Sequence, residues 1–127
     1  MIIWIASYPK SGNTYIRSFL SAYYFSKKGK FEFEQLLNIL QFPGTKFSTK
    51  DCFSFEDAAK NWIYSQNQFF NKEKFVFLKT HNTLKSYNNT EFTTSNETAG
   101  AIYIVRDPRN VISSICHHYS FSLDQAY

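Results

Sequence analysis

The sequence predicts an α/β fold built on a parallel central sheet. Three short runs, residues 2–6, 75–78 and 101–105, carry apolar residues in succession rather than in alternation. Such runs are typical of central strands, buried on both faces, in a parallel sheet. Stretches with helical spacing lie between them, which is the strand–helix order of α/β proteins. The chain has 127 residues, enough for a single domain over residues 1–127.

Helices are predicted over residues 14–25, 31–40, 55–70 and 108–119. In the first, an apolar stripe includes Phe19 and Tyr23, which the helical period puts on one face. Ser54 is a favourable N-cap for the third, and Pro108 stands early in the fourth, where its missing N–H costs little. Residues 84–98 are rich in Asn, Thr and Ser and are predicted to form a mobile loop.

Composition and charge exclude several classes of protein. The net charge of +4 suits an anionic ligand but is too small for the dense basic patch of a nucleic-acid binder. The apolar run at residues 2–6 is too short to span a membrane and follows no basic leader, so we expect a cytoplasmic protein without a transmembrane segment. Cys52 and Cys116 are far apart, which predicts ordinary buried thiols rather than a zinc site or a disulfide.

Polar residues follow each predicted strand. The segments are 7–10, 79–81 and 106–109. In open α/β sheets, ligands bind beyond the carboxyl ends of the strands. The three segments therefore point to one cleft.

The segment after the first strand has the properties of a phosphate-binding loop. It reads Tyr8-Pro9-Lys10-Ser11-Gly12-Asn13-Thr14-Tyr15 and leads into a helix. Backbone N–H groups at a helix N-terminus favour an anion. Gly12 permits close approach, Lys10 adds a charge, and Ser11 and Thr14 add hydroxyl donors. The alternative is a plain surface turn, and the spacing is not that of a Walker A motif.

This loop resembles the 5′-phosphosulfate loop of sulfotransferases that use 3′-phosphoadenosine-5′-phosphosulfate (PAPS), whose usual form is Y-P-K-S-G-T-T-W. Asn13 stands in place of the first Thr and still offers its backbone N–H. Tyr15 stands in place of the Trp and is still a flat ring that could stack on adenine. The resemblance implies that PAPS is the sulfuryl donor and that residues 10–15 bind it.

A second resemblance lies in the segment Arg106-Asp107-Pro108-Arg109-Asn110-Val111-Ile112-Ser113-Ser114. From the residues alone, Arg106 could bind a phosphate or pair with Asp107, and Asp107 is expected to organise the turn. The segment is similar to the family's 3′-phosphate motif, R-D-P-R-N-V-x-x-S. That similarity implies that Arg106 and Ser114 bind the 3′-phosphate.

The third segment is Lys79-Thr80-His81. A lone histidine after a strand is more often structural than catalytic. However, the family carries its catalytic histidine in the same K-T-H context, which implies that His81 takes the proton of the acceptor hydroxyl and that Lys79 lies near the sulfuryl group. Asn82-Thr83 follows where the family often has Leu-Pro. The adjacent histidines His117 and His118 are predicted to be helix-surface or packing residues rather than metal ligands.

Together these motifs imply a P-loop-like three-layer fold and PAPS-dependent sulfuryl transfer without a metal. The family's late R-K-G-x-x-G-x-W-K segment has no match, so we expect the N-terminal portion of such a domain, with an incomplete sheet. The acceptor stays open among small molecules and glycans, as does the oligomeric state. Two alternatives remain: a P-loop nucleotide kinase, and a non-catalytic nucleotide-binding remnant of a sulfotransferase.

Overall fold

Four parallel strands form the centre of the computed structural model, which describes residues 1–47, 54–69 and 74–126. The strands are β1 (Ile2–Ser7), β2 (Leu40–Gln41), β3 (Val76–Thr80) and β4 (Thr98–Ile104). Their order in the sheet is β2-β3-β1-β4, and every neighbouring pair is parallel. The predicted α/β class with a parallel central sheet is therefore confirmed.

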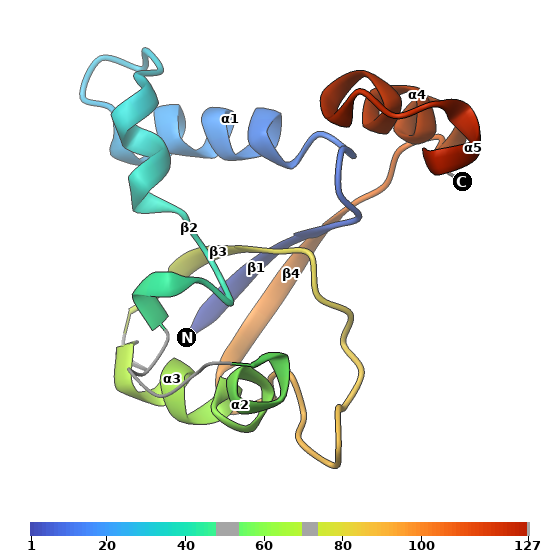
Figure 1. Cartoon of the computed structure of the whole chain (residues 1–127). Helices are drawn as coiled ribbons and strands as arrows, with labels where there is room; N and C mark the ends of the chain where they lie inside the picture. Colours follow the sequence, from blue (N-terminus) through green and yellow to red (C-terminus); the bar gives the residue numbers. More distant parts are fainter. Residues whose placement is uncertain (48–53, 70–73, 127) are drawn as a thin grey trace.

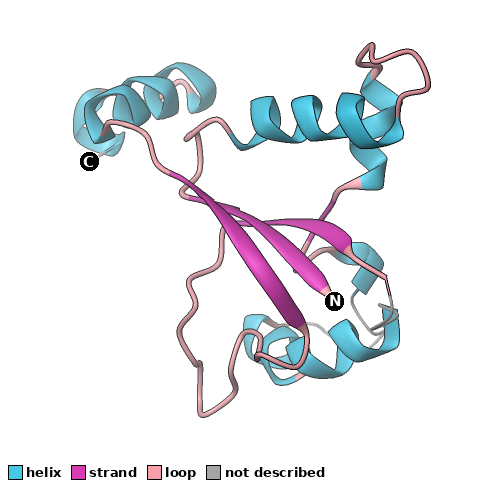
Figure 2. Cartoon of the chain, turned by 180° about the vertical axis from the view of Figure 1, so that it is seen from behind, coloured by secondary structure: helices cyan, strands magenta, loops and turns pink. Residues whose placement is uncertain are grey.

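Helices cover the sheet on both sides. The α-helices are α1 (Asn13–Phe25), α2 (Phe55–Lys60), α3 (Trp62–Phe69), α4 (Pro108–Tyr119) and α5 (Leu123–Ala126), and the 3₁₀ helices are η1 (Phe33–Asn38) and η2 (Thr45–Phe47). Figure 1 shows α1 on one side of the sheet and α2 with α3 on the other. Figure 2 shows the same three layers from behind. The arrangement is the three-layer P-loop-like fold.

The main core lies between the sheet and the layer of α2 and α3. Trp4 of β1 is its centre, with the ring of Phe92 at 5.0 Å and that of Phe42 at 5.7 Å between centroids. Trp62 of α3 packs edge-on against Phe92 at 5.2 Å. Buried aromatic rings contribute large apolar areas, so this cluster fixes the position of the sheet against α3.

The expectation that all three apolar runs are buried on both faces is wrong for β4. Tyr103 is 71% exposed and Ile102 is 38% exposed. The cause is position: β4 pairs only with β1 and is the outer strand of the described sheet. β1 lies between β3 and β4, and its Trp4 and Ile5 are buried as expected.

Two predicted helices are corrected. In the segment 31–40, η1 ends at Asn38 and Leu40 already belongs to β2, because Phe42 N donates to Lys79 O (2.8 Å) and so draws the chain onto β3. The segment 55–70 divides at Asn61 into α2 and α3, and its last residue lies outside the described residues. Ser54 is the predicted N-cap, since its Oγ accepts from Asp57 N at 3.2 Å.

The apolar stripe of α1 is not buried as a unit. Phe19 is 62% exposed and Tyr23 is 71% exposed, whereas Ser21 is buried. Phe19 and Tyr23 lie four residues apart on one face of α1, where their rings stack with 6.5 Å between the centroids, and Ser21 lies on the opposite face. The described structure therefore buries the face opposite the apolar stripe.

Residues 84–97 form a loop, and Thr98 already belongs to β4. This loop is attached to α3, because the buried Gln66 side chain donates to Phe92 O (2.7 Å) and accepts from Thr93 Oγ1 (2.7 Å). Of the two cysteines, Cys116 is a half-buried free thiol and Cys52 lies outside the described residues.

Candidate active site

The loop between β1 and α1 is a tight turn with an unusual backbone. Lys10 and Gly12 both have left-handed conformations, with φ of 64° and 101°. Glycine adopts this region freely, whereas a lysine there is strained. Ser11 N donates to Tyr8 O at 3.3 Å and closes the turn. Strained residues of this kind are concentrated in functional loops, which makes Lys10 a candidate binding residue.

Gly12 is the N-cap of α1, and no side chain of the described part of the molecule caps this end of the helix. The backbone N–H groups of the first helical turn have no partner within a helix. They carry the positive end of the helix dipole. The end of the turn therefore offers donors and partial positive charge to an anion.

Asn13 has a structural role that the sequence did not reveal. Its side chain is buried, and Nδ2 donates to Ile5 O at 3.0 Å and to Ser7 Oγ at 3.1 Å. These bonds fasten the start of α1 to the end of β1. The backbone N–H of Asn13, which was expected to face the ligand, is thereby fixed in position.

His81 follows β3 and is oriented by β1. Its Nδ1 lies 2.7 Å from the backbone oxygen of Ser7 and 3.3 Å from Ser7 Oγ. A carbonyl oxygen can only accept, so Nδ1 carries the hydrogen and the neutral ring presents Nε2 as an acceptor. An imidazole held in this way is suited to remove a proton through Nε2.

Lys79 lies at the end of β3 and is half-buried. Its Nζ donates to Gln41 Oε1 at 3.0 Å, which links β3 to β2. Burial, together with the nearby positive charge of Arg17, holds the pKa of Lys79 below its ordinary value of 10.5. A bound anion would offset both effects, so this position favours a negatively charged ligand.

Arg106 and Ser114 come from the end of β4 and from α4. The Arg106 guanidinium donates from Nη1 to Lys10 O at 3.0 Å, so the two predicted phosphate-binding segments are in direct contact. Arg106 is exposed and Ser114 is half-buried. The pairing of Arg106 with Asp107 that the sequence left open is replaced by this contact to Lys10.

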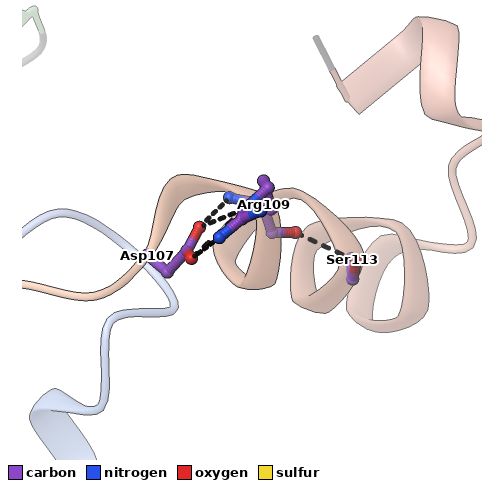
Figure 3. A network of polar contacts seen from close by, with 3 residues as sticks. All are labelled: Asp107, Arg109 and Ser113. Atoms are coloured by element: carbon purple, nitrogen blue, oxygen red, sulfur yellow. Dashed lines mark hydrogen bonds and ion pairs between the residues drawn. The ribbon is translucent and has the colours of Figure 1, made fainter.

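Asp107 organises the start of α4, as predicted. Its Oδ1 accepts from Arg109 N at 2.9 Å, and its carboxylate forms an ion pair with the Arg109 guanidinium at 2.6 Å. Figure 3 shows both contacts, together with the bond from Ser113 Oγ to Arg109 O (3.0 Å). The side-chain and backbone bonds from Arg109 hold the pKa of the Asp107 carboxyl below its ordinary value.

A cavity of about 600 Å³ opens at the carboxyl ends of the strands, and we call it the cationic cavity. It brings together most of the predicted site residues: Lys10, Gly12, Asn13, Thr14, Lys79, His81, Arg106 and Ser114. The described side chains that line it are cationic or neutral, with no carboxylate among them. The cleft inferred from the three segments therefore exists.

Two predicted binding residues do not line this cavity. Ser11 is buried and lines a neighbouring apolar cavity of about 470 Å³ with Arg106 and Val111. Tyr15, the predicted adenine-stacking ring, is 75% exposed on the first turn of α1.

A second cavity of about 440 Å³ lies beside the cationic cavity, and we call it the aromatic cavity. Its walls include the rings of Trp4, Tyr8, Phe92 and Tyr103. Among the described residues of these walls, His81 is the only His, Lys, Arg, Asp or Glu. His81 is also the one described residue that lines both cavities. The His81 imidazole therefore lies between a cavity with a cationic lining and one with an aromatic lining.

Sequence reasoning missed Gln41, His118 and Tyr119, which also line the cationic cavity. Gln41 belongs to the short strand β2, which the sequence did not predict, and it lies just beyond the predicted helix 31–40. His118 was assigned to the helix surface, and it is exposed, but its side of α4 faces the cavity. Its spacing of four residues from Ser114 is the signal that could have identified it.

Comparison with known families gives one match. The family model described as "sulfotransferase domain" matches residues 2–125. No curated protein gives a significant match to the sequence. In the described ranges, no helix has the length and apolar character needed to cross a membrane. Within the same ranges, no group of three or more His, Cys, Asp or Glu side chains is placed to hold a metal ion.

Proposed function

The chain belongs to the sulfotransferase domain family, and we propose that it transfers the sulfuryl group of PAPS to a hydroxyl or amine of a small acceptor. In this proposal residues 1–127 act as one sulfotransferase-like domain. The cationic cavity holds the donor and the aromatic cavity holds the acceptor. The observation that carries the proposal is the position of His81 in the walls of both cavities.

The residues of the cationic cavity fit an anionic nucleotide. Lys10, Lys79 and Arg106 supply positive charge, and Thr14 and Ser114 supply hydroxyl groups. The volume of about 600 Å³ lies within the range of roughly 300–1,000 Å³ that is usual for small-molecule sites. A nucleotide kinase would need carboxylates near the phosphates to hold Mg²⁺. The described residues that line this cavity include no carboxylate, which favours a metal-free transfer.

In this proposal, each phosphate of the nucleotide lies beside the structural element that carries its ligands. The N-terminus of α1, with Lys10 and Thr14, would hold the 5′-phosphosulfate. Arg106 and Ser114 would hold the 3′-phosphate. Arg106 can do so while it contacts Lys10 O, because a guanidinium has five N–H donors and that bond uses one.

His81 acts as the general base. PAPS, when bound, supplies the sulfuryl group and an adenosine bisphosphate leaving group. Ser7 O holds the Nδ1 hydrogen of His81 at 2.7 Å, which leaves Nε2 to take the proton of the acceptor as its oxygen or nitrogen attacks in line. Lys10, Lys79 and the amides of the loop stabilise the negative charge that develops on the leaving oxygen.

The aromatic cavity suits a neutral acceptor of small size. Trp4 and Phe92 provide buried apolar walls, and Tyr8 and Tyr103 provide exposed rings. Among the described residues, these walls contain no Lys or Arg that could bind a sulfated or carboxylated glycan. The lining therefore favours an apolar alcohol, phenol or amine over an acidic glycan.

The direct test is an assay of sulfuryl transfer from PAPS in the presence of EDTA. A panel of neutral phenols, alcohols, amines and sugars is incubated with the protein, and the sulfated products are measured by mass spectrometry. Product that forms without metal and is lost in His81→Ala supports the proposal. Phosphate transfer from ATP that requires magnesium would support the kinase instead. Binding of 3′-phosphoadenosine-5′-phosphate (PAP) without transfer to any acceptor would support a nucleotide-binding remnant.

A further inference from the structure

The cationic cavity contains a histidine to which the proposed function gives no role. His118 lies in the last turn of α4 and lines the cavity with Arg106 and Ser114. The side chain is exposed, so it can reach a ligand without any rearrangement of the core. Its ring meets that of Tyr119 edge-on, with 4.7 Å between the centroids, and Tyr119 lines the same cavity.

The geometry of α4 brings His118 close to Ser114. Residues four apart on a helix lie on one face, with Cβ atoms about 5–6 Å apart. Helical side chains lean back towards the N-terminus, so the imidazole of His118 covers the turn that carries Ser114. An anion held by the Ser114 hydroxyl is therefore within reach of the imidazole.

Charge favours the same contact. The described lining of the cavity includes Lys10, Lys79 and Arg106 but no carboxylate, so no acidic side chain of this lining competes for the imidazole. Asp107, the acidic residue at the other end of α4, is paired with Arg109 at 2.6 Å. An imidazole offers an N–H donor to a phosphate in either protonation state.

We propose that His118 is a third ligand for the 3′-phosphate of PAPS, beside Arg106 and Ser114. The inference rests on the proposed function, which assigns that phosphate to this end of the cavity. It makes His118 a residue that distinguishes a 3′-phosphorylated nucleotide from an ordinary adenosine monophosphate.

The chain provides a matched control in His117. It is also exposed and belongs to the same turn of α4, but it does not line the cationic cavity. Successive residues on a helix point in directions about 100° apart. Replacement of His117 therefore removes an identical side chain from the same helix without touching the proposed contact.

The experiment measures the dissociation constants of PAP and AMP by calorimetry for the wild type, His118→Ala, His118→Phe and His117→Ala. PAP and AMP differ only by the 3′-phosphate. We expect His118→Ala to reduce the preference for PAP over AMP by about tenfold, the effect of one hydrogen bond to a charged group. Binding of AMP should be unchanged. His118→Phe keeps the ring beside Tyr119 but has no N–H, so it should show the same loss, and His117→Ala should show none.

Equal weakening of PAP and AMP, or an unchanged preference in His118→Phe, would overturn the inference, because either result would mean that the ring supports the helix or the adenosine. Failure of the proposed function has a different signature. In that case the wild type itself binds PAP no better than AMP, and Arg106→Ala has no effect on the ratio. A preference that is lost in Arg106→Ala and kept in both His118 variants would leave the proposed function standing and remove only His118.

Discussion

The imidazole of His81 is held by the main chain of Ser7, whose carbonyl oxygen lies 2.7 Å from Nδ1. Ser7 is the last residue of β1, and His81 directly follows β3, the neighbouring parallel strand. The bond joins a fixed acceptor to the ring, so it selects both the tautomer and the orientation of the ring. The sequence left open whether His81 is structural or catalytic. The bond to Ser7 leaves its Nε2 free at the boundary of the two cavities.

The first prediction concerns this residue. Replacing His81 with Ala should lower sulfuryl transfer by about 10²–10⁴-fold, the usual contribution of a general base. PAP affinity should change little, because the proposed phosphate ligands Lys10, Arg106 and Ser114 lie in other segments and Lys79 is left in place. Steady-state transfer and calorimetric PAP binding are measured on the same preparations. His117→Ala serves as the control, and a parallel loss of PAP binding in His81→Ala would show that the residue is structural.

The second prediction concerns the contact of Arg106 with Lys10 O, 3.0 Å long. Arg106→Ala should remove the preference for PAP over AMP, by about 10-fold to 100-fold if one or two charge-assisted hydrogen bonds are lost. It should also loosen the loop around Lys10. Calorimetry with the two nucleotides gives the ratio. Arg109→Ala is the matched variant, because Arg109 pairs with Asp107 and does not line the cationic cavity. If Arg106→Ala still prefers PAP over AMP to the same degree, the 3′-phosphate binds elsewhere.

The elements that the sequence predicted well carry their signals locally. β1 and α4 were predicted almost to the residue, because a continuous apolar run and an early proline act over a few neighbouring positions. The polar segments that follow each strand were predicted for the same reason. Parallel strands then bring these separate segments to one edge of the sheet, and a common cleft follows from topology alone.

The features that were missed depend on contacts between distant segments. The strand β2 has two residues and exists because Phe42 N and Lys79 O meet across 37 positions of the chain, which no local pattern records. The exposure of Tyr103 depends on what covers β4 rather than on its sequence. Likewise, the position of His118 in the wall of the cationic cavity depends on how α4 sits against the loop of Lys10, and helical spacing alone could only suggest it.

The third prediction tests the backbone of the phosphate-binding loop. Gly12 has φ of 101°, and nothing lies within 4 Å of a Cβ added there. Gly12→Ala should therefore destabilise the fold through backbone strain alone, by about 1–2 kcal/mol. Because the strain can shift the first turn of α1, PAP affinity should fall as well. Urea unfolding and calorimetry measure the two effects.

The control for Gly12 is Gly100, in β4. A Cβ there also meets nothing within 4 Å, and the residue has no positive φ. Gly100→Ala should be neutral or stabilise the fold slightly, since alanine reduces the entropy of the unfolded chain. Equal destabilisation by both substitutions would mean that loss of glycine, and not the left-handed turn, is responsible.

The fourth prediction separates stability from function at Lys79. Burial and the charge of Arg17 hold the pKa of Lys79 below its ordinary value of 10.5, so the folded state disfavours its charged form. Lys79→Met removes the unfavourable burial of this charge and should therefore keep or raise the Tm at pH 7. The same substitution should weaken PAPS binding and transfer, because it removes a positive charge from the cationic cavity. Gln41 Oε1, which loses its donor, is exposed and can bond to water instead. Thermal unfolding and PAP calorimetry on the pair of proteins measure the two effects.

The pH dependence gives the sign of this effect. Burial of the protonated Lys79 amine lowers the free energy of unfolding, and this loss is fully present below the pKa of Lys79 in the folded state. The loss declines as the pH rises towards the pKa of the unfolded state, and it is absent above that pKa. Any advantage in Tm of Lys79→Met over the wild type should therefore be largest near neutral pH and should shrink in alkaline solution. Lys85→Met, at an exposed position, should show no such trend. If Lys79→Met lowers the Tm at pH 7 and the deficit does not vary with pH, then packing and the bond to Gln41 outweigh the desolvation of the charge.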